Sequence, residues 1–289
     1  MRVREVGVKE LGKIRGAVWR DEERRVWVEG NTAYVPVREG YSFTRDLSPR
    51  TPYSGRGYYL MGNVAVLHGK DPSEKEIREI VEWTGAEGVL LVHSCDGCER
   101  IPRAEVVYGT VGEVCHHEAG IRYHLDPRHL MFSMGNREEK ARLCANLRQG
   151  ERVADMFAGI GYFTLPIARR GAKVHAMEIN PLAYRYLVRN VGENAVTGRV
   201  KPEQGDCRDL LRGTYDRILM GHFESVQFLD SALHHAGPGT VLHVHSAGST
   251  PPDLGEALIQ AGFTGTITPR KVKKYAPHRW HYVQDVILA

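Results

Sequence analysis

The most constraining feature of the sequence is a regular alternation of strand-like and helix-like segments in its second half. Strands are expected at 152–157, 173–179, 199–206, 215–221 and 240–246. Helices are expected at 137–147, 162–170, 181–195, about 224–236 and 252–261. Strands that alternate with helices of this length require right-handed crossovers and a mainly parallel sheet. The alternation therefore predicts a doubly wound, Rossmann-like α/β domain over residues 136–289.

The first of these strands leads into a glycine-containing turn, DMFAGIG, which begins at Asp155 and includes Phe157. Gly159 and Gly161 allow the backbone to turn sharply and to approach a ligand where a side chain would collide. Open α/β sheets bind their ligands in the crevice beyond the strand ends. The turn is therefore a candidate ligand cradle.

Acidic residues follow at the ends of the next two strands. Glu178 lies 19 residues after Gly159, where a carboxylate accepts hydrogen bonds from both hydroxyls of a ribose. Asp206 and Cys207 end the third strand, where a side chain and a backbone amide read an adenine edge. Motifs at successive strand ends predict a nucleoside site.

Two nucleoside cofactors compete for such a site. A dinucleotide fingerprint has a third glycine, but Thr164 occupies that position here, and Asp155 suits a pyrophosphate poorly. S-adenosylmethionine (AdoMet) carries no phosphate and has a positive sulfonium and ammonium, which an acidic site favours. The sequence predicts AdoMet.

The first half of the chain has shorter elements. Strands are expected at 26–30 and 32–38, followed by a Pro/Gly/Ser/Arg-rich connection at 48–59. Further strands are expected at 63–69, 88–94 and 104–109, and Ser73 and Glu76 form a capping box that opens a helix through Trp83. We predict a basic, β-rich segment over 1–60 and a smaller α+β domain over 61–135.

Positive charge gathers at the two ends of the chain. Residues 1–60 hold 12 Lys or Arg against 8 Asp or Glu, and residues 266–289 hold 5 against 1. Basic ends around a near-neutral body favour a phosphate-bearing partner, although charge runs are more often solvated surface.

No apolar run approaches the roughly 18 residues of a membrane span, and the N-terminus does not resemble a signal peptide. We expect a cytoplasmic protein without a membrane partner. Five cysteines argue against a disulfide framework. Cys95 and Cys98 form a CxxC pair near Cys115-His116-His117, but no second pair follows at zinc-finger spacing, so reduced thiols are preferred and no metal is predicted.

Three segments resemble a known group of enzymes: DMFAGIGYFTLPIA, HAMEINPLAY and the C-terminal KKYAPHRWHYVQDVIL. They are similar to the class I AdoMet-dependent enzymes that modify the guanosine 3′ of the anticodon, and the resemblance covers about residues 60–289. One branch methylates guanine N1. The other, in wybutosine synthesis, transfers a 3-amino-3-carboxypropyl group from AdoMet.

Two segments distinguish the branches. The methyltransferases carry Pro-Arg after the Phe-Ser of the linker, the segment that leads from the smaller domain into the Rossmann-like domain, and Asn-Leu-Pro at the end of the fourth strand. This chain has FSMGN at 132–136 and MGH at 220–222, which resemble the aminocarboxypropyltransferases. The resemblance implies a tRNA 3-amino-3-carboxypropyltransferase that acts on the tricyclic guanine derivative at position 37 of tRNA(Phe) and releases methylthioadenosine. The alternatives are guanine-N1 methylation and a non-catalytic RNA-binding protein.

The same resemblance implies roles for single residues. Ser133 and Lys140 would hold the methionine carboxylate, although Lys140 also suits a solvated helix face and Ser133 a helix cap. His222 would contact the base or relay its proton, and a plain surface histidine is the alternative.

The C-terminal basic segment is the candidate contact with tRNA. Cationic and aromatic side chains that hold phosphates and stack on bases are Lys271, Lys273, Lys274, Arg279 and Trp280. A β-hairpin with solvated lysines explains the same pattern equally well. No obligate protein partner is inferred.

Overall fold

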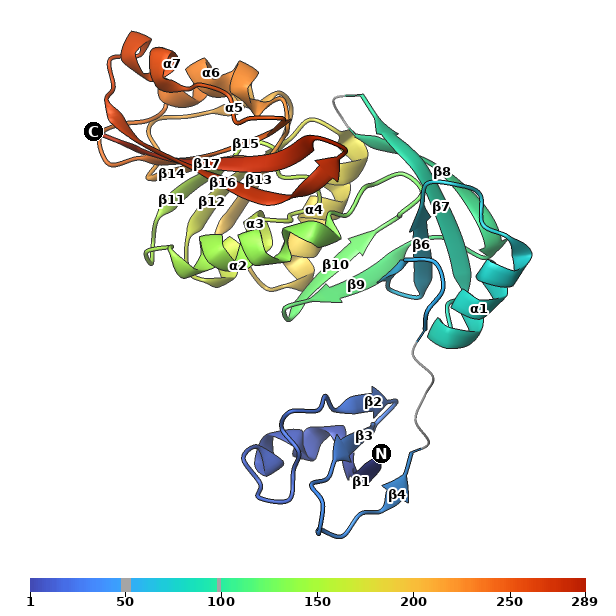
Figure 1. Cartoon of the computed structure of the whole chain (residues 1–289). Helices are drawn as coiled ribbons and strands as arrows, with labels where there is room; N and C mark the ends of the chain where they lie inside the picture. The colour runs from blue at the N-terminus through green and yellow to red at the C-terminus, as the bar shows by residue number, and fades with distance from the viewer. Residues whose placement is uncertain (48–52, 98–99) are drawn as a thin grey trace. The chain divides into compact units, whose positions relative to one another are not determined.

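The computed structural model describes residues 1–47, 53–97 and 100–289. The chain divides into two compact units, Met1–Ser54 and Gly55–Ala289 (Figure 1). The predicted connection at 48–59 lies partly outside the described residues, as does Cys98 of the CxxC pair. Within the described part of the chain, no helix combines the length and apolar composition that a membrane span requires.

The N-terminal unit is an antiparallel sheet in the order β2-β3-β1-β4 with a 3-10 helix at Val8–Ile14. Its strands are β1 (Arg2–Gly7), β2 (Trp27–Glu29), β3 (Thr32–Pro36) and β4 (Arg45–Asp46). Strands β2 and β3 were predicted, whereas β1 was not, because only two of its residues, Val3 and Val6, are apolar. Val3, Ala33 and Val35 are fully buried and form its core.

The larger unit opens with a four-stranded sheet in the order β5-β6-β7-β8. Its strands are β5 (Tyr59–Met61), β6 (Val64–His68), β7 (Gly88–Asp96) and β8 (Ile101–Gly109). Helix α1 (Glu74–Thr84) connects the parallel pair β6 and β7. The predicted capping box is confirmed: the Ser73 hydroxyl accepts the Glu76 N–H at 3.3 Å, and the Glu76 carboxylate accepts the Ser73 N–H at 2.7 Å.

A hairpin that the sequence did not predict follows, formed by β9 (Val114–Glu118) and β10 (Ile121–Leu125). It lies against helix α4 (Pro181–Glu193), where the Asn190 side chain accepts the His124 N–H at 2.8 Å. One apolar cluster runs from the four-stranded sheet through this hairpin to the helices of the next sheet. The hairpin therefore joins the two halves of the larger unit.

The C-terminal half is a seven-stranded sheet in the order β13-β12-β11-β14-β15-β17-β16. Its strands are β11 (Arg152–Asp155), β12 (Lys173–Glu178), β13 (Val200–Gln204), β14 (Arg217–Met220), β15 (Val241–Gly248), β16 (Gly265–Ala276) and β17 (Arg279–Leu288). The first five strands in this order are parallel, and β17 and β16 add an antiparallel edge. The predicted doubly wound, mainly parallel sheet is confirmed.

Helices cover both faces of this sheet (Figure 1). The helices bury the strands on both sides. Because the side chains of a strand point alternately to opposite faces, Val153 belongs to one apolar cluster and Ala154 to the other. One face carries α2 (Arg137–Ala145), α3 (Thr164–Arg169) and α4, and the other carries α5 (Cys207–Leu210), α6 (Leu229–Leu233) and α7 (Gly255–Gln260).

All five helices predicted in this half are shorter in the structure, and α6 and α7 differ most from their predictions. The segment 224–236 begins as a 3-10 helix, Ser225–Phe228, before the short helix α6. Helix α7 begins at Gly255 rather than 252, because the Asp253 side chain accepts the Gly255 N–H at 2.8 Å and holds a local turn before the helix.

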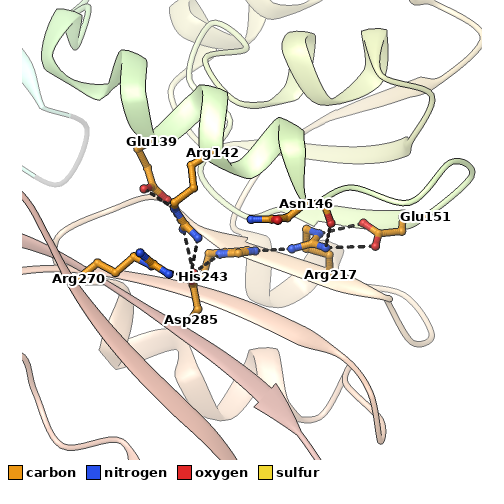
Figure 2. Close-up of polar contacts among 8 residues, drawn as sticks. All are labelled: Glu139, Arg142, Asn146, Glu151, Arg217, His243, Arg270 and Asp285. Carbon is orange, nitrogen blue, oxygen red and sulfur yellow. Dashed lines mark hydrogen bonds and ion pairs between the residues drawn. The ribbon is translucent and has the colours of Figure 1, made fainter.

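A chain of buried charges fixes helix α2 to the sheet (Figure 2). Arg142 donates two hydrogen bonds to Asp285, at 2.6 and 2.9 Å. Asp285 also contacts His243 Nδ1 at 2.6 Å, and Arg217 bridges His243 Nε2 at 2.6 Å and Glu151 at 2.9 Å. Because a guanidinium only donates, His243 Nε2 accepts and its Nδ1 carries the proton toward Asp285. The network holds α2, and with it the preceding linker, in one position.

Candidate active site

A cavity of about 1030 Å³ opens at the carboxyl ends of the parallel strands in the larger unit. Strand β11 lies between β12 and β14, so the strand order reverses at this point, where open α/β sheets bind ligands. Of the predicted site residues, the cavity wall contains Ser133, Phe157, Gly159, Glu178, Asp206, Cys207, His222 and Lys273. The fold thus brings together most of the side chains that the sequence singled out.

The glycine turn shapes the floor of the cavity. Gly159 has φ +56°, and a Cβ there would lie 2.5 Å from the Tyr162 ring. Gly161 has φ +102°, and a Cβ there would lie 2.8 Å from Leu165 Cγ, so this glycine serves close packing below the cavity. Gly159 donates its N–H to Glu178 Oε2 at 2.7 Å, which orients the carboxylate at the cavity wall.

Glu178 is also held from its other side. Its Oε1 accepts the Asn180 N–H at 2.8 Å, and the Asn180 side chain in turn caps helix α4. Backbone amides from two loops therefore fix this carboxylate at the end of β12. Glu178 lies at the strand end where the sequence placed it, and its contact with a ribose stays a prediction.

Asp155 lies below the cavity rather than in its wall. Its side chain is fully buried, and Oδ2 accepts the Thr164 hydroxyl at 2.7 Å. Burial raises the pKa of Asp155 to about 6, and the negative charge of Glu178 adds to this shift. Asp155 therefore supports the glycine turn from below and does not line the cavity.

Asp155→Asn is expected to flatten the pH dependence of stability. A raised pKa means that the fold favours the protonated acid, so its contribution is complete below the unfolded pKa near 3.9 and is lost as the pH rises through about 6. Between pH 4 and 7.5 the unsubstituted protein should lose about 2 kcal/mol relative to the variant. Urea unfolding at both pH values measures the difference, and equal slopes for the two proteins would contradict the assignment.

Aromatic and apolar side chains form the wall beyond the third strand. The rings of Phe157 and Phe228 meet edge to face at 5.1 Å, and the Arg208 guanidinium lies 5.0 Å over Phe228. Asp206 caps α5, and its hydrogen bonds with Arg208 hold its pKa below the usual range. Burial raises the pKa of the Cys207 thiol to about 12, so Cys207 is a neutral packing residue and no nucleophile.

His222 faces the cavity from the end of β14. Its ring lies 5.5 Å from that of Phe157, and its Nδ1 accepts the Glu224 N–H at 3.2 Å. Burial and the nearby Arg100 lower the pKa of His222, so the imidazole is neutral near pH 7. With Nδ1 accepting, Nε2 carries the proton, which makes His222 a hydrogen-bond donor in this arrangement.

The two residues that were expected to hold the methionine carboxylate lie in different places. Ser133 lines the cavity and makes no helix-capping hydrogen bond. Lys140 is buried, with 5% of its surface exposed, and pairs with Glu118 beside the ring of Phe132. Lys140 is thus neither in the cavity wall nor a solvated helix lysine.

The C-terminal basic segment is the β16–β17 hairpin, as its alternative interpretation expected. Lys271 lies 4.8 Å over the Trp280 ring, while Lys274 and Arg279 are exposed. Lys273 instead enters the cavity and donates to Ser133 Oγ at 3.1 Å. The sequence placed these residues together as a contact with tRNA, but in the structure Lys273 lines the cavity while Lys274 and Arg279 are exposed.

Sequence patterns missed further residues of the cavity wall, among them Arg100, His245 and His281. Arg100 comes two residues after the CxxC pair, which does not mark an arginine as a site residue, and the two histidines lie within strands, so no local signal marks the three residues. Cys95 also lines the cavity. Among the described residues no group of three metal-ligating side chains comes together.

Known proteins resemble the chain in sequence and fold. Residues 114–255 match the family described as the TRM5/TYW2 methyltransferase domain. A Methanocaldococcus jannaschii protein named tRNA(Phe) (4-demethylwyosine(37)-C(7)) aminocarboxypropyltransferase is 36% identical over 244 residues, which cover 80% of this chain and 97% of that protein.

Two solved structures extend this result. The crystal structure of M. jannaschii TYW2 in complex with AdoMet aligns with a TM-score of 0.65 and 30% identity, covering 80% of this chain and 98% of that one. The crystal structure of Trm5b from Pyrococcus abyssi aligns with a TM-score of 0.72 and 27% identity, covering 99% of both chains. The chain belongs to the TRM5/TYW2 family, on the branch of the tRNA(Phe) aminocarboxypropyltransferases.

Proposed function

We propose that this protein transfers the 3-amino-3-carboxypropyl group of AdoMet to C7 of 4-demethylwyosine at position 37 of tRNA(Phe), with release of methylthioadenosine. One observation carries the proposal. Linker residues 132–136 and the strand-end residues Gly221 and His222, by which the two branches of the family differ, line the same cavity as Glu178. The residues that distinguish the reactions therefore surround the predicted cofactor site.

The residues present fit AdoMet. A volume of about 1030 Å³ admits a nucleoside together with part of an acceptor base. The glycine turn leaves room for the ligand, and the fixed carboxylate of Glu178 suits ribose hydroxyls. Phe157 and Phe228 provide flat apolar walls for adenine.

When bound, AdoMet supplies a γ-carbon whose bond to sulfur breaks as C7 of the base attacks it, after which the base loses its C7 proton. The chain's own contribution is chiefly orientation, because transfer depends on which carbon faces the acceptor. His222 presents Nε2–H at the strand end next to Phe157, where it donates a hydrogen bond to the entering base. Its lowered pKa keeps this donor neutral.

A transfer assay tests the proposal. The protein is incubated with tRNA bearing the tricyclic base and AdoMet labelled either in the methyl group or in the carboxyl carbon. Carboxyl label in the RNA, with methylthioadenosine released, is the expected result. Methyl label in the RNA would instead establish guanine-N1 methylation, and no label in the RNA would favour a binding protein. Transfer RNA that carries unmodified guanosine is the control acceptor.

The tRNA contact is part of the same proposal. A base beside the anticodon leaves its stack to enter a pocket. The β16–β17 hairpin supports a contact with the RNA, because Lys271 lies over Trp280 and Lys274 and Arg279 are exposed. We further assign residues 61–135 and the basic first 60 residues to docking on the tRNA body, and the protein to the cytoplasm.

A further inference from the structure

Lys273 enters the cavity from β16, the edge strand of the seven-stranded sheet. Its Nζ donates to the Ser133 hydroxyl at 3.1 Å, although 140 residues separate the two in sequence. Ser133 belongs to the linker segment FSMGN, which distinguishes the two branches of the family. A lysine of the edge strand thus contacts the segment by which the two branches of the family differ.

Gly135 of the same segment makes room for this lysine. A Cβ at position 135 would lie 2.6 Å from Lys273 Nζ and 2.8 Å from its Cδ. Carbon atoms do not approach other atoms so closely, so a side chain here would displace the flexible end of Lys273. Gly135 therefore leaves the space in which the ammonium group lies, and its backbone is not left-handed.

The surroundings of Lys273 are cationic or neutral. Arg100 lines the same cavity and lies 4.8 Å over the Phe223 ring. His281 Nε2 and His245 Nδ1 share a hydrogen bond of 2.9 Å. Burial and the charge of Arg100 both lower the pKa of Lys273. Among the described residues, no carboxylate lies within ion-pair distance of Lys273 or Arg100. Two cations of the cavity wall that have no carboxylate partner among the described residues favour an oxyanion ligand.

Glu178 and Lys273 lie on opposite sides of the glycine turn. Glu178 ends β12 and Asp206 follows β13, on one side of β11 in the strand order, whereas Lys273 comes from β16 and Glu224 follows β14 on the other side. AdoMet has a matching asymmetry, with a nucleoside at one end and a carboxylate at the other. Lys140, expected at that carboxylate, is instead paired with Glu118.

We propose that Lys273, admitted by Gly135 and assisted by Arg100 and the Ser133 hydroxyl, anchors the carboxylate of the methionine part of AdoMet. The inference rests on the proposed function. It makes Lys273 a positioning residue, because the anchored carboxylate decides which carbon beside the sulfur faces the acceptor base.

Calorimetric binding of AdoMet and of methylthioadenosine, without RNA, tests the anchor. Methylthioadenosine lacks the carboxylate. Lys273→Met is expected to weaken AdoMet binding about 10- to 100-fold, as loss of a charge-assisted contact does, and to change methylthioadenosine binding less than about 2-fold. Lys173 is an exposed lysine at the start of β12, whereas Glu178 at the other end of this strand lines the cavity. Lys173→Met should therefore leave both affinities unchanged.

Gly135→Ala provides a second variant that keeps every charge. It displaces the ammonium group without removing it, so AdoMet binding should weaken about 3- to 10-fold while methylthioadenosine binding is retained. Circular dichroism confirms that both variants are folded. Equal loss of both ligands would overturn the anchor, because the effect would then not depend on the carboxylate.

An RNA phosphate is the other source of an oxyanion. If Lys273→Met leaves AdoMet affinity unchanged and weakens tRNA binding, the lysine contacts phosphate and the anchor is refuted. The proposed function fails separately: methyl label transferred by the unsubstituted protein would refute that function, while a selective loss of AdoMet affinity in Lys273→Met would still support the anchor.

Discussion

Glu178→Gln is expected to weaken the binding of AdoMet and of methylthioadenosine equally, by about 100-fold. The substitution removes the charge that ribose hydroxyls would contact. It also places an amide NH₂ where Gly159 and Asn180 both donate N–H groups, so one backbone donor loses its acceptor. Calorimetry with each ligand measures the effect, and label transfer to tRNA should fall in parallel.

Equal loss distinguishes Glu178 from Lys273, because both ligands carry the ribose and only AdoMet carries the carboxylate. Glu256→Gln, on the exposed surface of α7, is the matched control and should retain both affinities. If Glu178→Gln bound both ligands as tightly as the unsubstituted protein, the nucleoside would have to lie elsewhere in the cavity.

Asp285→Ala is expected to destabilise the larger unit by about 3 kcal/mol, the loss expected when one partner of a buried ion pair is removed. Asp285 receives hydrogen bonds from Arg142 and His243, and only 15% of its side chain is exposed (Figure 2). Its removal leaves the Arg142 guanidinium without this partner between α2 and the sheet. Urea unfolding at pH 7 measures the change.

The same variant has a defined pH dependence. Arg142 and His243 hold the pKa of Asp285 well below its usual range. A lowered pKa contributes stability that is present above the unfolded value near 3.9 and is lost as the pH falls toward the folded value. The difference between the two proteins should therefore shrink in strong acid. Asp230→Ala on α6, whose carboxylate is 83% exposed, should cost less than about 0.5 kcal/mol, and a similarly small loss for Asp285→Ala would refute the network's role.

Local patterns were sufficient for the sheet and for one side of the cavity. Buried strands, amphipathic helices and a glycine turn are properties of neighbouring residues, so β11 to β15 and the carboxylate at the end of β12 followed from spacing alone. The same reasoning missed β1 and the β9–β10 hairpin. In β10 the apolar residues Ile121, Tyr123 and Leu125 alternate with polar ones, which is a local strand signal, whereas β1 has only Val3 and Val6 as apolar residues and is fixed by pairing with β3, about 30 residues away in sequence.

The chain's sequence was enough to indicate a doubly wound sheet, a nucleoside site beyond the ends of its strands, and a family of tRNA-modifying enzymes. It could not decide which lysine reaches the cavity. Lys140 lies 7 residues from Ser133 but turns to Glu118, and Lys273 lies 140 residues away and meets the serine. That choice depends on the β16–β17 register, on the charge network that holds α2, and on the space left at Gly135, because a side chain's direction is settled by the surfaces packed around it.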